Sequence, residues 1–169
     1  MIRVGLVGCG TIGTQLALAI DRRYQSATRL VALHDQDPAR AFRLQHQLRH
    51  PPAVCSFPEL IRRSELIIEA ASAEAAVLVV RTALARGRSV FVMSVGGLLQ
   101  DQRWRRLLRH GGRLYVPSGA LAGLDGVKAM AMGRIRSASL TTRKPPKALA
   151  GAPYIAARRL DLSRCRRPM

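Results

Sequence analysis

The residues best suited to chemistry form a glycine-rich loop near the start of the chain. The glycines have the spacing GxGxxG, between a run of strand-forming residues and a helix-like segment. In that context the glycines allow a tight turn, a close backbone approach to a pyrophosphate and close helix–strand packing, while free N–H groups at the start of the helix face the phosphates. The alternative is a glycine turn without a ligand. We expect the cofactor-binding residues of this loop to be Gly8, Gly10, Thr11, Ile12 and Gly13.

A carboxylate follows where recognition of a ribose would require one. Asp35 lies 22 residues beyond Gly13, at the end of the second strand-like run. There a carboxylate accepts hydrogen bonds from the adenosine ribose hydroxyl groups, and its charge repels the 2′-phosphate of NADP. We therefore expect NAD as the cofactor, with NADP as the alternative because Arg40 lies nearby in the sequence.

The segments that must position this loop alternate between strand and helix patterns. Strands are expected at residues 2–7, 29–34, 54–57, 66–70, 89–94 and 114–116, with helices at 11–20, 38–50, 58–63, 73–86 and 101–110. Strands joined by helical crossovers of this length form a parallel sheet with helices on both faces. The sequence predicts an α/β fold, a Rossmann-type doubly wound parallel sheet that forms an NAD(P)-binding domain over residues 1–120.

Small or polar residues follow three of these strands. In open parallel sheets, ligands bind beyond the carboxyl ends of the strands, where small side chains let a nicotinamide ring lie close to the backbone. Ordinary loop residues are the alternative explanation. The residues concerned are Ala71 and Ser72, then Ser94, and then Ser118, Gly119 and Ala120.

The pattern changes beyond residue 120. A helix is expected at residues 124–132, and residues 134–143 alternate polar and apolar side chains like a strand of a different sheet. We expect residues 121–169 to be the beginning of an incomplete α+β substrate domain, because the strand at 137–143 has no expected partner strand in the sequence.

Composition and charge limit the classes of function. Apolar residues make up 48% of the chain, which argues against disorder, and aromatic residues make up only 4%, which argues against base stacking. The net charge of +18 would favour a nucleic-acid partner, but residues 134–169 carry half of it, and 25 of the 28 basic residues of the chain are arginine. Nucleic-acid binding is therefore only a distant alternative.

The cysteines and the apolar runs indicate a cytoplasmic protein. Three cysteines without ligand spacing predict neither a disulfide framework nor a metal site. The N-terminal apolar run is too short for a secretory signal, and Glu69 and Glu74 interrupt the longest apolar stretch, so no membrane partner is expected.

Five segments together resemble the L-aspartate dehydrogenase family, whose members oxidise the amine of L-aspartate to iminoaspartate with NAD or NADP. These segments are GCGTIG at 8–13, EAAS at 69–72, SVGGL at 94–98, PSGALAGLDG at 117–126 and TTRKPPKAL at 141–149. The resemblance extends from Met1 to about Ser163. One departure is Gly97, where the family usually has Ala.

The resemblance implies roles for individual residues. The glycine loop would hold the pyrophosphate, and Ala120 would lie against the nicotinamide end of the cofactor. Ser94, Ser118 and Gly119 would line the reacting cleft, and Lys144 would lie in a segment that borders the substrate. The resemblance also implies L-aspartate as the substrate, a role in NAD biosynthesis and a homo-oligomer if the protein is complete.

No catalytic residue is identified in this sequence. The family's NxNVA motif and catalytic histidine have no counterpart, and the chain's four histidines, at positions 34, 46, 50 and 110, are expected on the surface or in packing. Lys144 is a weak candidate for the base, with a solvated or carboxylate-binding lysine as the alternative. We expect a truncated or frameshifted aspartate dehydrogenase-like oxidoreductase; the alternative is an inactive NAD-binding remnant.

Overall fold

The computed structural model describes residues 1–99, 101–117, 127, 130–139, 141, 143–149 and 152–162. The chain divides into two compact units, Met1–Leu121 and Ala122–Met169. The first unit contains the glycine loop together with all of the strands in the described part of the chain.

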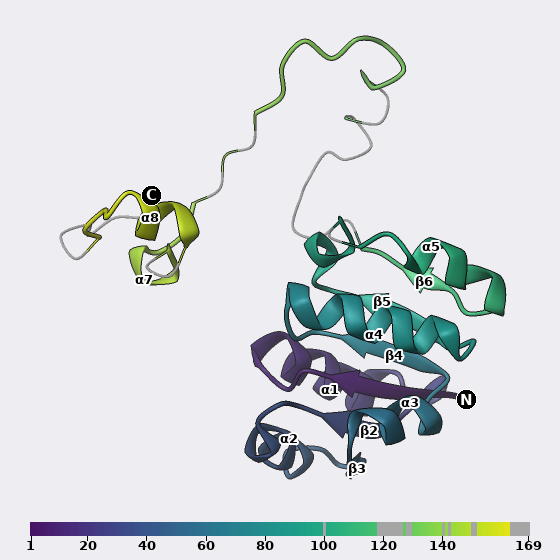
Figure 1. Ribbon diagram of the computed structural model, residues 1–169. Helices are drawn as coiled ribbons and strands as arrows, with labels where there is room; N and C mark the ends of the chain where they lie inside the picture. Colours follow the sequence, from purple (N-terminus) through teal and green to yellow (C-terminus); the bar gives the residue numbers. More distant parts are fainter. Residues whose placement is uncertain are drawn as a thin grey trace. The chain divides into compact units, whose positions relative to one another are not determined.

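The first unit is built on a parallel sheet of six strands in the order β3-β2-β1-β4-β5-β6. Figure 1 shows the strands side by side, with β3 and β6 at the two edges. The order reverses between β1 and β4, which is the topological switch point of a doubly wound sheet. The prediction of a Rossmann-type α/β fold is confirmed. The strands are β1 (Ile2–Val7), β2 (Thr28–His34), β3 (Ala53–Val54), β4 (Leu66–Glu69), β5 (Ser89–Val92) and β6 (Leu114–Tyr115).

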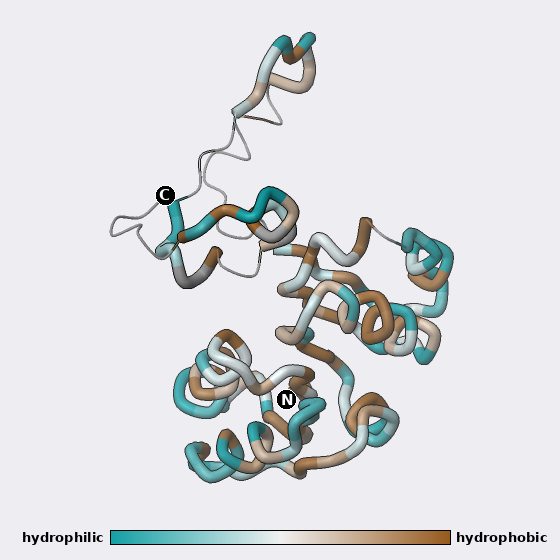
Figure 2. The backbone as a smooth tube through the Cα atoms, turned by 60° about the vertical axis from the view of Figure 1, so that its left-hand side comes forward, coloured by the Kyte–Doolittle hydropathy of each residue, from teal (hydrophilic) through white to brown (hydrophobic). Residues whose placement is uncertain are grey.

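Helices cover both faces of this sheet and bury an apolar core on each. Helices α1 and α2 pack on one face, around residues such as Leu6, Leu33 and Leu44, whereas α3, α4 and α5 pack on the other. Figure 2 shows that hydrophobic and hydrophilic residues both occur in the coiled segments of the chain. The helices are α1 (Thr11–Arg23), α2 (Pro38–Gln45), α3 (Phe57–Arg63), α4 (Ala73–Ala85) and α5 (Trp104–Leu107), with the 3-10 helices η1 (Val95–Leu99) and η2 (Leu108–His110).

Local signals set the ends of two helices. Asp37 accepts a hydrogen bond from the N–H of Ala39 (3.0 Å), and Pro38 follows as the first residue of α2. Ser72 caps α4 in the same way, through the N–H of Ala75 (3.2 Å). After α4, Gly87 adopts a positive φ of 66°, as expected for a glycine that ends a helix.

Helix α2 ends five residues earlier than the sequence pattern predicts, at Gln45 rather than near position 50. The backbone N–H groups of Arg49 and His50 do not continue the helix but donate to the carboxylate of Asp21 in α1, at 2.8 and 3.1 Å. The Nδ1 atom of His50 also lies 3.0 Å from this carboxylate. Asp21 is 5% exposed and fastens the chain that leaves α2 to the end of α1.

The second unit contains two short helices in its described part, α7 (Pro146–Leu149) and α8 (Pro153–Ala157). The predicted strand at 137–143 is wrong: residues 130–139, 141 and 143 form no strand. An isolated strand has no partner for its backbone hydrogen bonds, and no other strand exists among the described residues of this unit to supply one. The predicted helix at 124–132 lies largely outside the described residues. The assignment of residues 121–169 to a substrate domain stays a prediction.

The contacts of Asp21 predict a pH-dependent contribution to stability. Burial acts to raise the pKa of Asp21, but the hydrogen bonds from Arg49 and His50 outweigh it and lower the pKa below its usual value. A lowered folded-state pKa means that the stabilisation is present above the unfolded pKa and is lost as the pH falls through the folded one. Asp21→Asn should therefore cost roughly 2 kcal/mol at neutral pH, because an amide N–H2 then faces backbone donors, and less in acid.

Urea unfolding measured across a pH series checks this prediction. The matched control is Asp37→Asn, an exposed position where Asn caps a helix as well as Asp does. Equal losses of stability at neutral and acidic pH for Asp21→Asn would contradict the prediction.

Candidate dinucleotide site

The glycine loop joins β1 to α1 at the carboxyl edge of the sheet. Gly8 has a φ of 95°, a conformation that L side chains rarely adopt. A Cβ atom on Gly8 would lie 2.6 Å from the carbonyl carbon and oxygen of Ala70, at the end of β4. Both the backbone conformation and the available space therefore require glycine at this position.

The other two glycines of the motif meet opposite surroundings. A Cβ atom on Gly13 would overlap the carbonyl oxygen of Gly8, so this glycine lets α1 pack directly on the turn. A Cβ atom on Gly10 would meet nothing within 4 Å. Gly10 precedes α1, and no side chain caps the first turn of that helix. Open space in front of uncapped helix N–H groups is the arrangement that accommodates a phosphate.

A pocket of about 270 Å³ opens beside this loop. It lies between the carboxyl ends of β1, β2 and β4 and the start of α4, next to the point where the strand order reverses. The residues that line it include Gly8, Gly10, Asp35, Phe57, Ala71 and Ser72. The structure thus brings predicted residues from three separate segments to one pocket.

Asp35 is fixed at the wall of this pocket. One of its oxygens, Oδ2, accepts a hydrogen bond from the backbone N–H of Cys9 at 2.7 Å, and Oδ1 accepts one from the N–H of Asp37 at 2.9 Å. The carboxylate therefore stands next to the glycine loop, with remaining lone pairs available to ribose hydroxyl groups. Arg40 also lines the pocket and forms an ion pair with Asp37 at 3.5 Å.

A buried carboxylate that the sequence pattern did not identify holds the neighbouring strand ends together. Glu69, the last residue of β4, is completely buried, and its carboxylate accepts hydrogen bonds from Ala71 and Ser94. The sequence analysis noted Glu69 as an acid that interrupts an apolar run and as the first residue of the EAAS segment, but assigned it no role in the site. An acidic residue inside an otherwise apolar strand was the available signal, because a buried carboxylate needs nearby donors.

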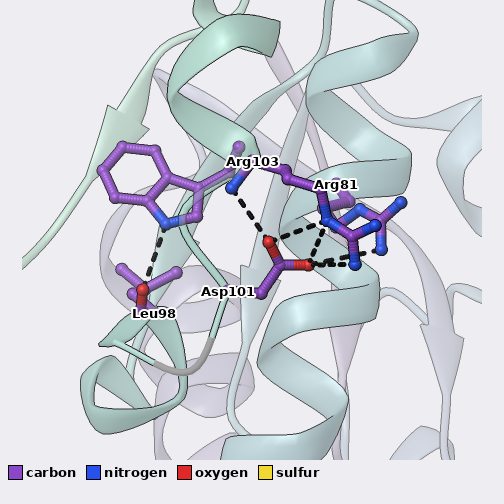
Figure 3. Close-up of polar contacts among 5 residues, drawn as sticks. Arg81, Leu98, Asp101 and Arg103 are labelled. Atoms are coloured by element: carbon purple, nitrogen blue, oxygen red, sulfur yellow. Dashed lines mark hydrogen bonds and ion pairs between the residues drawn. The ribbon is translucent and has the colours of Figure 1, made fainter.

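The chain beyond β5 is held against α4 by polar contacts. Asp101 accepts hydrogen bonds from the backbone and guanidinium N–H groups of Arg103, at 2.9 to 3.0 Å, and from Arg81 of α4 at 3.4 Å (Figure 3). The indole N–H of Trp104 donates to the carbonyl oxygen of Leu98 at 3.2 Å. These contacts fix the segment that follows Ser94.

The remaining predicted residues occupy different surroundings. Thr11 and Ile12 lie in the exposed first turn of α1, beside Gly10. Ser118, Gly119 and Ala120 lie outside the described residues. Lys144 is exposed and belongs to the second unit.

Two of the histidines have structural contacts in the first unit. The Nδ1 atom of His34 lies 3.0 Å from the carbonyl oxygen of Cys55, and His50 contacts Asp21 as described above. No group of three or more metal-ligating side chains occurs in the described part of the chain, and no helix there is long and apolar enough to cross a membrane.

Comparison with known families matches residues 8–117 to the NAD-binding domain of homoserine dehydrogenase. The matched segment begins at the first glycine of the loop and ends just beyond β6. The chain belongs to this family of NAD-binding domains. The family match supports NAD as the cofactor, in agreement with the glycine loop and Asp35.

Relatives confirm the resemblance to L-aspartate dehydrogenases. An L-aspartate dehydrogenase of Methanosarcina barkeri is 42% identical over 96% of this chain and 61% of its own length. One of Bradyrhizobium diazoefficiens is 38% identical over 99% of this chain and 60% of its own length. The chain thus spans about three fifths of these curated relatives.

Solved structures share the fold. An NAD-binding oxidoreductase from Klebsiella pneumoniae matches 80% of this chain and 40% of its own, with a TM-score of 0.59 and 22% identity. Aspartate dehydrogenase from Thermotoga maritima matches 89% of this chain and 67% of its own, with a TM-score of 0.51 and 15% identity. At these identities the likeness shows the fold alone.

The environment of Cys9 predicts an unreactive thiol inside the loop. Burial, together with the nearby charge of Asp35, raises the pKa of Cys9 to about 12. Because the thiolate is the reactive form, Cys9 should resist alkylation by iodoacetamide at about pH 8 in the folded protein and react after unfolding. Peptide mass spectrometry locates the modified residue, and rapid modification of Cys9 in the folded chain would contradict the described loop.

Proposed function

We propose that this chain binds NAD at the loop between β1 and α1 and is the cofactor-binding part of an L-aspartate dehydrogenase. The observation that carries the proposal is the glycine cradle itself, in which two glycines are required by close contacts and Gly10 leaves open space before uncapped helix N–H groups. The names of the relatives supply the substrate, L-aspartate. Bound nicotinamide would accept the hydride from the Cα atom of that amino acid.

The residues of the first unit would bind and orient the two halves of the cofactor. The N–H groups at Thr11 and Ile12 would donate to the pyrophosphate, and Asp35 would accept from the adenosine ribose. The Ala71–Ser72 turn and Ser94 would border the nicotinamide half, because they end strands on the other side of the switch point. Arg40 leaves NADP as a weaker alternative cofactor.

Removal of a proton from the substrate amine is not assigned to a residue of the first unit. The histidines at positions 34 and 50 are engaged in the contacts described above. Lys144 is exposed, and we propose that it binds a substrate carboxylate rather than acting as the base. Ser118 and Gly119 stay predicted substrate residues. A homo-oligomer, a cytoplasmic location and a role in NAD biosynthesis stay predictions.

Gly10→Val tests the proposed site. The backbone at Gly10 has φ −75° and ψ −164°, which valine can adopt, and a Cβ atom there has no protein atom within 4 Å. The variant should therefore keep the stability of the wild-type chain and lose NAD binding in titration calorimetry, since valine fills the space meant for the pyrophosphate.

The matched control for this test is Gly133→Val, at an exposed glycine in the second unit where a Cβ atom meets nothing closer than 3.8 Å.

Aspartate-dependent formation of NADH by the wild-type chain tests the enzymatic part of the proposal. NAD binding without NADH formation would favour a binding module, and equal NAD affinity of Gly10→Val and wild type would contradict the proposed site.

Asp35→Ser tests the preference for NAD over NADP. Loss of the carboxylate removes acceptors for the ribose hydroxyl groups and also removes the repulsion of a 2′-phosphate. NAD should bind about tenfold more weakly or worse, while NADP binding is retained or improved. Asp37→Ser is the control, because serine also caps α2 and Asp37 is not among the residues that line the pocket. An unchanged ratio of the two affinities in Asp35→Ser would contradict the assigned role.

A further inference from the structure

The side chain of Glu69 is surrounded by donors from two strand ends. Its Oε1 atom accepts from the backbone N–H of Ala71 at 2.8 Å and lies 2.9 Å from the hydroxyl oxygen of Ser94. Its Oε2 atom accepts from the backbone N–H of Ser94 at 3.0 Å. Glu69 itself is 0% exposed, so its carboxylate is shielded from water. One carboxylate therefore fixes the turn after β4 and the end of β5 together.

These contacts decide what the hydroxyl group of Ser94 can offer to a ligand. A serine hydroxyl has one hydrogen and two lone pairs, and a carboxylate can only accept. The hydrogen of Ser94 is therefore directed to Glu69, and the hydroxyl retains only lone pairs for another partner. Because the backbone N–H of Ser94 also donates to Glu69, neither donor of this residue remains for a ligand.

The position of Ser94 relates it to one end of the proposed cofactor. Asp35 follows β2 and Ser94 follows β5, so three strand spacings, roughly 14 Å, separate these two strand ends. The glycine loop follows β1, which lies between them. An extended dinucleotide with its ribose at Asp35 and its pyrophosphate at the loop extends its nicotinamide toward β4 and β5.

We propose that Glu69 is a positioning residue that makes Ser94 a hydrogen-bond acceptor for the carboxamide N–H2 group of nicotinamide. The inference rests on the proposed binding of NAD. A nicotinamide held by its carboxamide has a fixed ring rotation, which determines the face of the ring that is presented to the substrate. The same carboxylate holds the Ala70–Ala71 peptide against which Gly8 packs, so it supports the glycine loop as well.

The test compares NAD with 3-acetylpyridine adenine dinucleotide, in which a methyl group replaces the carboxamide N–H2 and the carbonyl group is kept. In titration calorimetry, the wild-type chain should bind NAD about fivefold more tightly than the analogue, because only the carboxamide N–H2 group of NAD can donate to Ser94. Ser94→Ala should reduce this ratio toward one, since neither ligand then finds the acceptor.

Two further variants separate this role from a general structural one. Ser89→Ala removes a hydroxyl from the amino end of β5, at the other end of the strand that Ser94 follows, and should leave the ratio of affinities at the wild-type value. Glu69→Gln places an amide N–H2 group next to the N–H and O–H donors of Ser94. The serine hydroxyl is then no longer held in one direction. The ratio of NAD affinity to analogue affinity should therefore fall, as it does in Ser94→Ala. Should Glu69→Gln fail to fold, Ser94→Ala still decides the proposal.

The outcomes are distinct. The inference is supported if the ratio of NAD affinity to analogue affinity falls in Ser94→Ala and keeps its wild-type value in Ser89→Ala. NAD binding by the wild-type chain with the same ratio in Ser94→Ala overturns the inference and leaves the proposed function intact. A wild-type chain that binds neither dinucleotide overturns both.

Discussion

The contact between the carbonyl group of Gly8 and the Cα atom of Gly13 is the constraint on which the site depends. Any side chain at position 13 would overlap that carbonyl oxygen, so α1 can start directly on the turn after β1 only with glycine there. This close packing directs the first N–H groups of α1 toward the carboxyl edge of the sheet, beside the pocket that Asp35 lines. The anion-binding character of the loop thus follows from a steric requirement of the fold.

Two carboxylates then organise the edge around this loop, on opposite sides of β1. Asp35 holds the backbone of Cys9 and Asp37 on the β2 side, and Glu69 holds Ala71 and Ser94 on the β4 and β5 side. Asp35 lies in a pocket and can accept further hydrogen bonds, whereas Glu69 is buried among its donors. The first therefore suits direct contact with a ligand, and the second acts through the residues that it holds.

The periodicity of the sequence was sufficient for the sheet and for the glycine loop, because short β-branched runs and turn glycines act locally. The end of α2 was mispredicted because Asp21, distant in the sequence, binds the N–H groups that would have extended the helix. The predicted strand at 137–143 was wrong because alternation of polar and apolar residues does not supply a partner strand. Glu69 was overlooked as part of the site because its three donors come together only in the folded sheet.

Backbone amide NMR during an NAD titration tests the central claim most directly. If the pyrophosphate lies against the start of α1, saturable chemical-shift changes should be largest for residues 8–13 and Asp35 and should extend to Ala71 and Ser94. Such changes confined to other parts of the chain, or no saturable change at all, would contradict the account.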